Sequence, residues 1–73
     1  LDRLKDPKST LQEKVQSLGQ ASPFYQTIRE TGLDHDKTFE IAVYVNNKEL
    51  ATGTGRNKQE AEQKAAQKAL ELI

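Results

Sequence analysis

The first helical pattern in the chain lies near its beginning. Leu11, Val15 and Leu18 recur at spacings of four and three residues, which places them in one apolar stripe along a helix. Gly19 follows the stripe and is a typical residue at a helix C-terminus. The spacing therefore predicts a helix over about residues 8–18, with an opposite face made of hydroxyl, amide and carboxylate side chains.

A second helical pattern closes the chain. Asn57 is a favourable N-cap, and Glu60 follows three residues later, as in a capping box. The sequence predicts a helix over about residues 58–73, and its alanines indicate that its backbone packs closely on a sheet. The residues expected on its buried half are Ala61, Ala65, Ala66, Ala69, Leu70, Leu72 and Ile73.

Three strands are predicted between the helices. Large apolar residues occupy every second position of residues 38–45, which is typical of a strand with one buried face. Residues 24–31 are rich in aromatic and β-branched side chains but alternate imperfectly, which is compatible with a bulge. Asn46-Asn47 predicts a tight turn into a short strand at about residues 49–54. Residues 32–37 are expected to form a loop.

The order of elements is therefore α-β-β-β-α, an α+β fold. We expect a three-stranded antiparallel sheet with both helices packed on one face. A chain of 73 residues has room for one small domain. Residues 1–7 lack an amphipathic period and are interpreted as a linker or tail, because Pro7 favours extended backbone before it. Residues 8–73 form the predicted domain.

Composition excludes several classes of protein. The chain has no cysteine and one histidine, so it offers no thiolate or multi-histidine metal site. No apolar run approaches the roughly 20 residues that a membrane-spanning helix needs. Eleven basic residues balance eleven acidic ones, which argues against binding polyanions through bulk charge alone. The chain begins at Leu1 and has no methionine, so we expect it to be a piece of a longer protein.

The sequence gives no catalytic constellation. His35 lies between Asp34 and Asp36, but neighbours in sequence rarely point at one another, and a loop histidine with local contacts is the simpler interpretation. Residues 53–55 contain two glycines without the spacing or the Lys-Ser/Thr ending of a phosphate-binding loop. We therefore predict no catalytic residue and no metal site in this chain.

Anion binding is the better supported chemistry. The start of the last helix supplies unpaired N–H groups and the positive end of a helix dipole. Cations outnumber carboxylates across the final loop and helix, although a mixed charge run on a helix is ordinarily a solvated face. The residues concerned are Arg56, Lys58, Lys64 and Lys68, against Glu60 and Glu62.

Four blocks in this order resemble a double-stranded RNA-binding domain. They are residues 7–13, 23–25, 32–39 and 53–66, and the resemblance extends over residues 6–73. Leu11-Gln12-Glu13 and the Glu60–Gln63 segment make the chain most similar to the C-terminal domain of bacterial ribonuclease III. The fold of that family is α-β-β-β-α, as the periodicity also predicts.

The resemblance implies binding to A-form duplex RNA, by shape more than by sequence. Members of the family cover about 16 base pairs and contact two minor grooves and the phosphates between them. Amide and hydroxyl side chains suit the 2′-hydroxyl groups of those grooves. By resemblance, the minor-groove residues of the first helix are Ser9, Gln12, Glu13 and Gln16. The second-groove residues are His35 and Lys37, and the phosphate-contacting residues are Arg56, Asn57, Lys58, Gln59 and Gln63.

Two positions depart from the general family pattern. Gln59 and Glu62 stand where many members have lysine, although the glutamate suits the ribonuclease III group. We therefore expect modest phosphate affinity, with Arg56 and Lys58 carrying most of its salt dependence.

The resemblance also implies what this chain lacks. In ribonuclease III, hydrolysis belongs to a separate N-terminal domain that uses Mg²⁺ and forms a homodimer. We therefore expect this chain to be no nuclease by itself, to need no cofactor, and to position RNA for a cytoplasmic endonuclease involved in RNA processing, including rRNA processing. The alternative is a protein-interaction or dimerisation module of the same fold that does not bind RNA.

Overall fold

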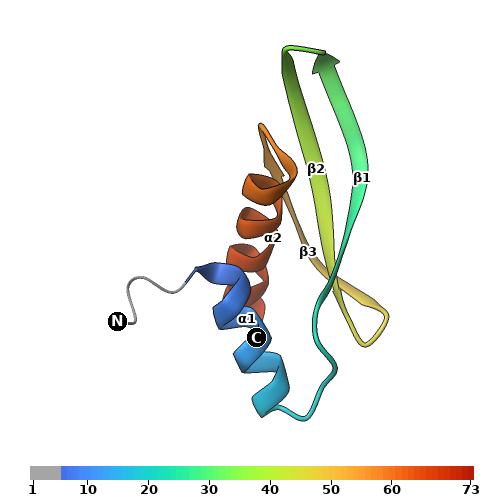
Figure 1. Ribbon diagram of the computed structural model, residues 1–73. Helices are drawn as coiled ribbons and strands as arrows, with labels where there is room; N and C mark the ends of the chain where they lie inside the picture. Colours follow the sequence, from blue (N-terminus) through green and yellow to red (C-terminus); the bar gives the residue numbers. More distant parts are fainter. Residues whose placement is uncertain (1–5) are drawn as a thin grey trace.

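The computed structural model describes residues 6–73 and has two layers (Figure 1). An antiparallel sheet with strand order β1-β2-β3 forms one layer, and both helices lie on the same face of it. This arrangement confirms the predicted α-β-β-β-α fold. The elements are α1 (Pro7–Ser17), β1 (Phe24–Leu33), β2 (Asp36–Val45), β3 (Lys48–Gly55) and α2 (Lys58–Leu72).

Helix α1 begins earlier than the sequence indicates. Asp6 has extended backbone, and its Oδ1 accepts a hydrogen bond of 2.8 Å from the Ser9 N–H, so Asp6 is the N-cap. Pro7 is the first helical residue, a position where its missing N–H costs nothing. Asp6 and Pro7, which the sequence predicts to be part of a linker or tail, therefore belong to the cap and first turn of α1. The rest of the predicted tail, residues 1–5, lies outside the described residues.

The C-terminus of α1 is closed as predicted at Gly19. This glycine has a φ of +78°, a left-handed conformation that most side chains disfavour. The Gly19 N–H donates to the Gln16 carbonyl, and the Gln20 N–H donates to the Val15 carbonyl, each at 3.0 Å. These two bonds form a Schellman motif, which satisfies carbonyls that the helix end would otherwise leave without partners.

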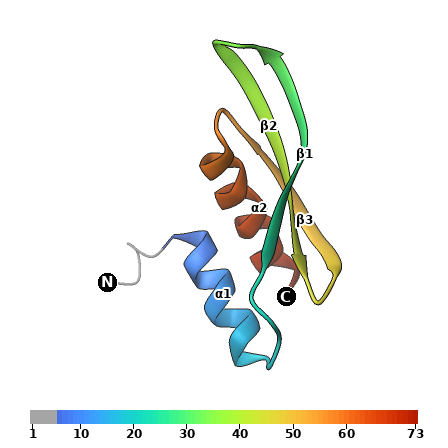
Figure 2. The same cartoon turned by 45° about the vertical axis from the view of Figure 1, so that its right-hand side comes forward.

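The hairpin between β1 and β2 is longer than predicted. Residues 32–37 are not a loop, because Gly32 pairs with Lys37 and Leu33 pairs with Asp36. Only Asp34 and His35 form the turn. The hairpin extends past the start of α2, so its end has no helix behind it (Figure 2). The register shifts between Thr27 and Arg29, which confirms the bulge.

The second hairpin follows the prediction closely. Asn46 and Asn47 have φ angles of +54° and +63°, as a type I′ turn requires at both central positions. Strand β3 is one residue longer at each end than the predicted span.

The core lies between the two helices and the inner face of the sheet. Leu11 and Val15 of α1 are fully buried and belong to one cluster with Val43 and Val45 of β2. Helix α2 contributes only alanines to the buried core: Ala61, Ala65, Ala66 and Ala69. These small side chains bring the α2 backbone close to β3, on which α2 mainly packs.

Three apolar residues expected in the core are largely exposed. Leu18 is 57% exposed, Leu72 66% and Ile73 40%. All three stand at the C-terminal ends of the helices, and Leu18 and Ile73 border a hollow together with Val45 and Leu50 of the sheet. Periodicity predicts which face of a helix a residue occupies, but it does not predict how tightly that face is packed.

Candidate nucleic-acid interface

Three polar regions follow one another along one side of the molecule. In both views, α1 comes first, the start of α2 next, and the turn of the β1–β2 hairpin last (Figures 1 and 2). The sequence assigns RNA-binding residues to each of these regions. The fold therefore brings segments from the beginning, middle and end of the chain into one row.

The outer face of α1 is polar because its apolar residues are all turned inward. Ser9, Gln12, Glu13 and Gln16 are exposed, whereas Leu11 is fully buried. The Gln16 side chain donates to the Ser22 hydroxyl at 3.3 Å, which ties α1 to the segment that leads into β1. The face thus presents the amides and carboxylates that the sequence predicts.

Asp6 organises the first turn of this helix. Its carboxylate accepts a hydrogen bond of 2.8 Å from the Ser9 N–H. This bond, together with the nearby side chains of Gln63 and Ser9, lowers the pKa of Asp6 below its ordinary value of 3.8. The first turn of α1 is therefore held in place by a carboxylate that stays ionised.

The turn of the hairpin presents His35 to solvent. Asp34, His35 and Asp36 are all exposed, and among the described residues His35 makes no hydrogen bond with either aspartate. Lys37 lies behind the turn and is half-buried, with its Nζ 3.7 Å from a Glu30 carboxylate oxygen. The positive charge of Lys37 is therefore partly balanced before any ligand arrives.

The start of α2 is capped by its own side chains. Asn57 Oδ1 accepts from the Glu60 N–H at 2.8 Å, as predicted. Glu60 Oε1 accepts from the Arg56 N–H at 2.7 Å, one residue before the position that a capping box uses. A carboxylate thus already occupies part of the space where a free helix N-terminus would attract an anion.

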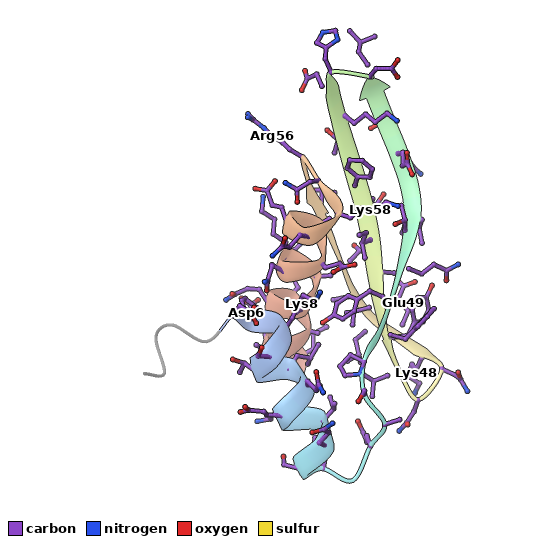
Figure 3. The ribbon with its side chains drawn as sticks, viewed as in Figure 1. Asp6, Lys8, Lys48, Glu49, Arg56 and Lys58 are labelled. Atoms are coloured by element: carbon purple, nitrogen blue, oxygen red, sulfur yellow. The ribbon has the colours of Figure 1, made fainter. Side chains whose placement is uncertain are left out.

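Phosphate binding at this end consequently depends on side chains. Arg56, Lys58 and Gln59 are exposed, and Figure 3 shows Arg56 pointing away from the sheet. Within residues 6–73, the side chains of Arg56 and Lys58 form no ion pair, whereas Lys64 lies 4.0 Å from Glu60. Arg56 and Lys58 are therefore cations available to a polyanion at the start of α2.

Gln63 has a different role from its neighbours. It is partly buried, its Oε1 accepts from the Lys8 N–H at 3.2 Å, and its side chain contributes to the lowered pKa of Asp6. The structure thus places this predicted phosphate contact at the junction between the helices. Glu62 lies beside it and pairs with Lys8. Lys8 was not singled out from the sequence, because a partner 54 residues away leaves no local pattern.

One hollow in the described part of the chain lies away from these three regions. It has a volume of about 440 Å³ and is lined by residues that include Phe24, Gln26 and Tyr44. These side chains alternate with residues that face the helices, so the hollow lies on the open face of the sheet. None of the predicted binding residues lines this hollow. Most of them are exposed, so the candidate interface is an open surface and not a pocket.

No group of three or more histidine or acidic side chains is suitably placed to hold a metal ion in residues 6–73. No described helix is long and apolar enough to cross a bilayer.

Comparison with known sequences supplies independent information. The sequence pattern of the family described as "Double-stranded RNA binding motif" matches residues 7–73. Ribonuclease 3 of Campylobacter fetus is 49% identical over 67 residues, which cover 92% of this chain and 30% of that protein. Ribonuclease 3 of Streptococcus agalactiae is 48% identical over 72 residues, covering 99% and 32%. The chain thus spans about a third of the length of these relatives.

Solved structures agree in fold. A structure of Arabidopsis HYL1, described with its implications for miRNA processing, has a TM-score of 0.78 and 31% identity, covering 90% of this chain and 93% of that one. The second double-stranded RNA-binding domain of DRB4 has a TM-score of 0.65 and 34% identity, covering 90% and 92%.

Proposed function

Because this chain belongs to the family of double-stranded RNA-binding motifs, we propose that it binds A-form RNA through α1, the start of α2 and the β1–β2 turn. It is the RNA-binding module of a ribonuclease III-like protein, since its Ribonuclease 3 relatives align along nearly its whole length. The observation that carries the proposed surface is the row of three exposed polar regions along one side of the fold.

Each region suits a different part of the duplex. The amides of Gln12 and Gln16 are able to donate to and accept from 2′-hydroxyl groups and base edges in a shallow minor groove. Glu13 accepts from a 2′-hydroxyl or from a guanine amino group. His35 at the hairpin turn reaches the next minor groove. Arg56 and Lys58 contact the phosphates between the two grooves.

We extend the proposal to the longer protein to which this domain belongs. Its relatives are ribonucleases, so this domain raises affinity for duplex RNA and places it over a catalytic domain outside the present chain. That domain uses Mg²⁺ and forms a homodimer, and the domain described here cuts no RNA by itself. Long duplex RNA incubated with this domain and Mg²⁺ therefore stays intact, whereas cleavage into short duplexes contradicts the proposal.

The primary test is a titration with one duplex sequence of about 20 base pairs, prepared as RNA and as DNA. Each titration is run at two salt concentrations. We expect RNA to bind more tightly, with an affinity that falls as salt rises, because phosphate contacts release counterions. If the folded domain binds neither duplex, the proposal fails and the protein-interaction alternative is favoured.

A further inference from the structure

The apolar contact between the two helices is made mostly by small side chains of α2. Leu11 and Val15 of α1 pack in a cluster whose fully buried α2 members are Ala65, Ala66 and Ala69, with the partly buried Leu70 packed against it. The buried stripe of α1 decides which of its faces points outward, but alanines form shallow ridges and apolar attraction has no direction, so this contact determines the crossing angle of α1 on α2 only loosely. Directional contacts are needed to set that angle.

Such contacts are concentrated at the start of α1. Lys8 Nζ lies 2.5 Å from Glu62 Oε1, with side chains that are 35% and 25% exposed. The backbone N–H of Lys8 donates to Gln63 Oε1 at 3.2 Å, which is a second directional contact between α1 and α2. Figure 3 shows Asp6 and Lys8 together where α1 meets α2.

The same lysine also contacts the sheet. Its Nζ lies 5.2 Å from the centre of the Tyr25 ring, within the range of a cation–π interaction. Lys8 therefore joins α1 to α2 through Glu62 and to β1 through Tyr25. Partial burial makes this ion pair less screened than a fully exposed one.

From these contacts we infer that Lys8 and Glu62 are positioning residues for RNA binding. Their ion pair sets the angle at which α1 crosses α2, and so aligns the minor-groove face of α1 with the phosphate-binding residues at the start of α2. This inference rests on the proposed function. It explains the carboxylate at position 62, which has its partner within the domain.

The test compares RNA affinity in four proteins: wild type, Lys8→Met, Glu62→Met and the double variant. Methionine keeps the apolar stem over Tyr25 and removes the charge. We expect each single variant to bind the RNA duplex about fivefold more weakly, the effect of losing an interaction of about 1 kcal/mol. The double variant is expected to bind no more weakly than the singles, because the pair is already broken in each.

Simple charge effects make different predictions. If only net charge matters, Glu62→Met binds more tightly than wild type and Lys8→Met more weakly, while the double variant matches wild type. Tighter binding by Glu62→Met, or wild-type affinity of the double variant, would overturn the inference. All affinities are measured well below the unfolding temperature of each variant, so that a loss of stability alone leaves them unchanged.

A matched control removes another ion pair from a different place. Arg29 and Glu40 pair at 3.6 Å between β1 and β2, away from the helix junction. The Arg29→Met/Glu40→Met variant is expected to keep wild-type affinity. A control that weakens binding as much as the Lys8 variants overturns the inference, while RNA binding by wild type still supports the proposed function. Absence of binding by wild type overturns both.

Discussion

Gly53 of β3 lies against the Ala61 carbonyl of α2 so closely that no side chain fits between them. A Cβ placed on Gly53 would stand 2.6 Å from that carbonyl oxygen and would collide with the backbone nitrogen of Ala65 as well. Both obstacles are helix backbone, which cannot move aside as a flexible side chain does. This contact fixes the height of α2 above the sheet.

We therefore predict that Gly53→Ala destabilises the domain by about 3 kcal/mol, because α2 must lift from β3 to admit the methyl group. A loss of that size is a large share of the stability of a small domain. Denaturant unfolding monitored by circular dichroism measures it. Thr54→Ala, on the exposed side of the same strand, is the control and changes stability by at most about 1 kcal/mol.

A second prediction concerns the cap of α2. Asn57→Ala removes the acceptor of the Glu60 N–H and is expected to cost about 1 kcal/mol of unfolding free energy. Asn57→Asp keeps an acceptor and is expected to retain most of the stability. Equal stability of the alanine variant and wild type would contradict the role of Asn57 as a cap.

A third prediction addresses phosphate binding. Lys58→Ala is expected to reduce the slope of log affinity against log salt concentration by about one unit, as the loss of one phosphate contact does. Lys48 is the first residue of β3 and lies away from Arg56 and Lys58 (Figure 3), so Lys48→Ala leaves the slope unchanged. An unchanged slope in the Lys58 variant would show that Lys58 contacts no phosphate.

A fourth prediction follows from the Tyr25 hydroxyl, which is buried without a hydrogen-bond partner among residues 6–73. Burial raises the pKa of Tyr25 from 10.0 to about 12, and the charges of Glu62 and Asp6 add to the effect. Between these two values the unfolded chain loses the proton while the folded domain keeps it. The stability that Tyr25 contributes is therefore fully present below pH 10.0 and is lost as the pH rises to about 12.

Unfolding midpoints measured across that pH range test this sign. Wild type is expected to lose stability more steeply than Tyr25→Phe, in which nothing titrates at this position. Tyr44→Phe keeps the buried hydroxyl and is the matched control, expected to follow wild type. Parallel curves for wild type and Tyr25→Phe would contradict the prediction.

Local patterns in the sequence account for most of the fold. Phe39, Ile41, Val43 and Val45 at every second position identify β2, and Asn57 identifies the start of α2, because each signal lies within one element. The alternation does not predict that Ala42, on the opposite face of β2, is also buried.

The β1–β2 hairpin was harder to predict. Residues 32–37 contain Gly, two Asp and His, which favour loops. In the structure Gly32 and Leu33 instead pair with Lys37 and Asp36, because the pairing of β1 with β2 continues up to the two-residue turn.

The candidate site was predictable where it depends on exposure. An amphipathic helix with a known buried stripe identifies its exposed face, which is why Gln12 and Gln16 lie as expected. Contacts between distant segments give no such signal. The crossing of α1 over α2 is set by tertiary packing. It decides that Gln63 lies beside Asp6 and Lys8, and that Glu62 pairs with Lys8.

The unsupported end of the β1–β2 hairpin has a consequence for how the domain adapts to a ligand. A two-stranded ribbon is only marginally stable without a layer behind it, so its amides open without unfolding the core. Hydrogen exchange near Thr31 and Thr38 should therefore be much faster than at Val43, which lies beneath the helices. The turn can shift to meet grooves of different width while the helices keep their spacing.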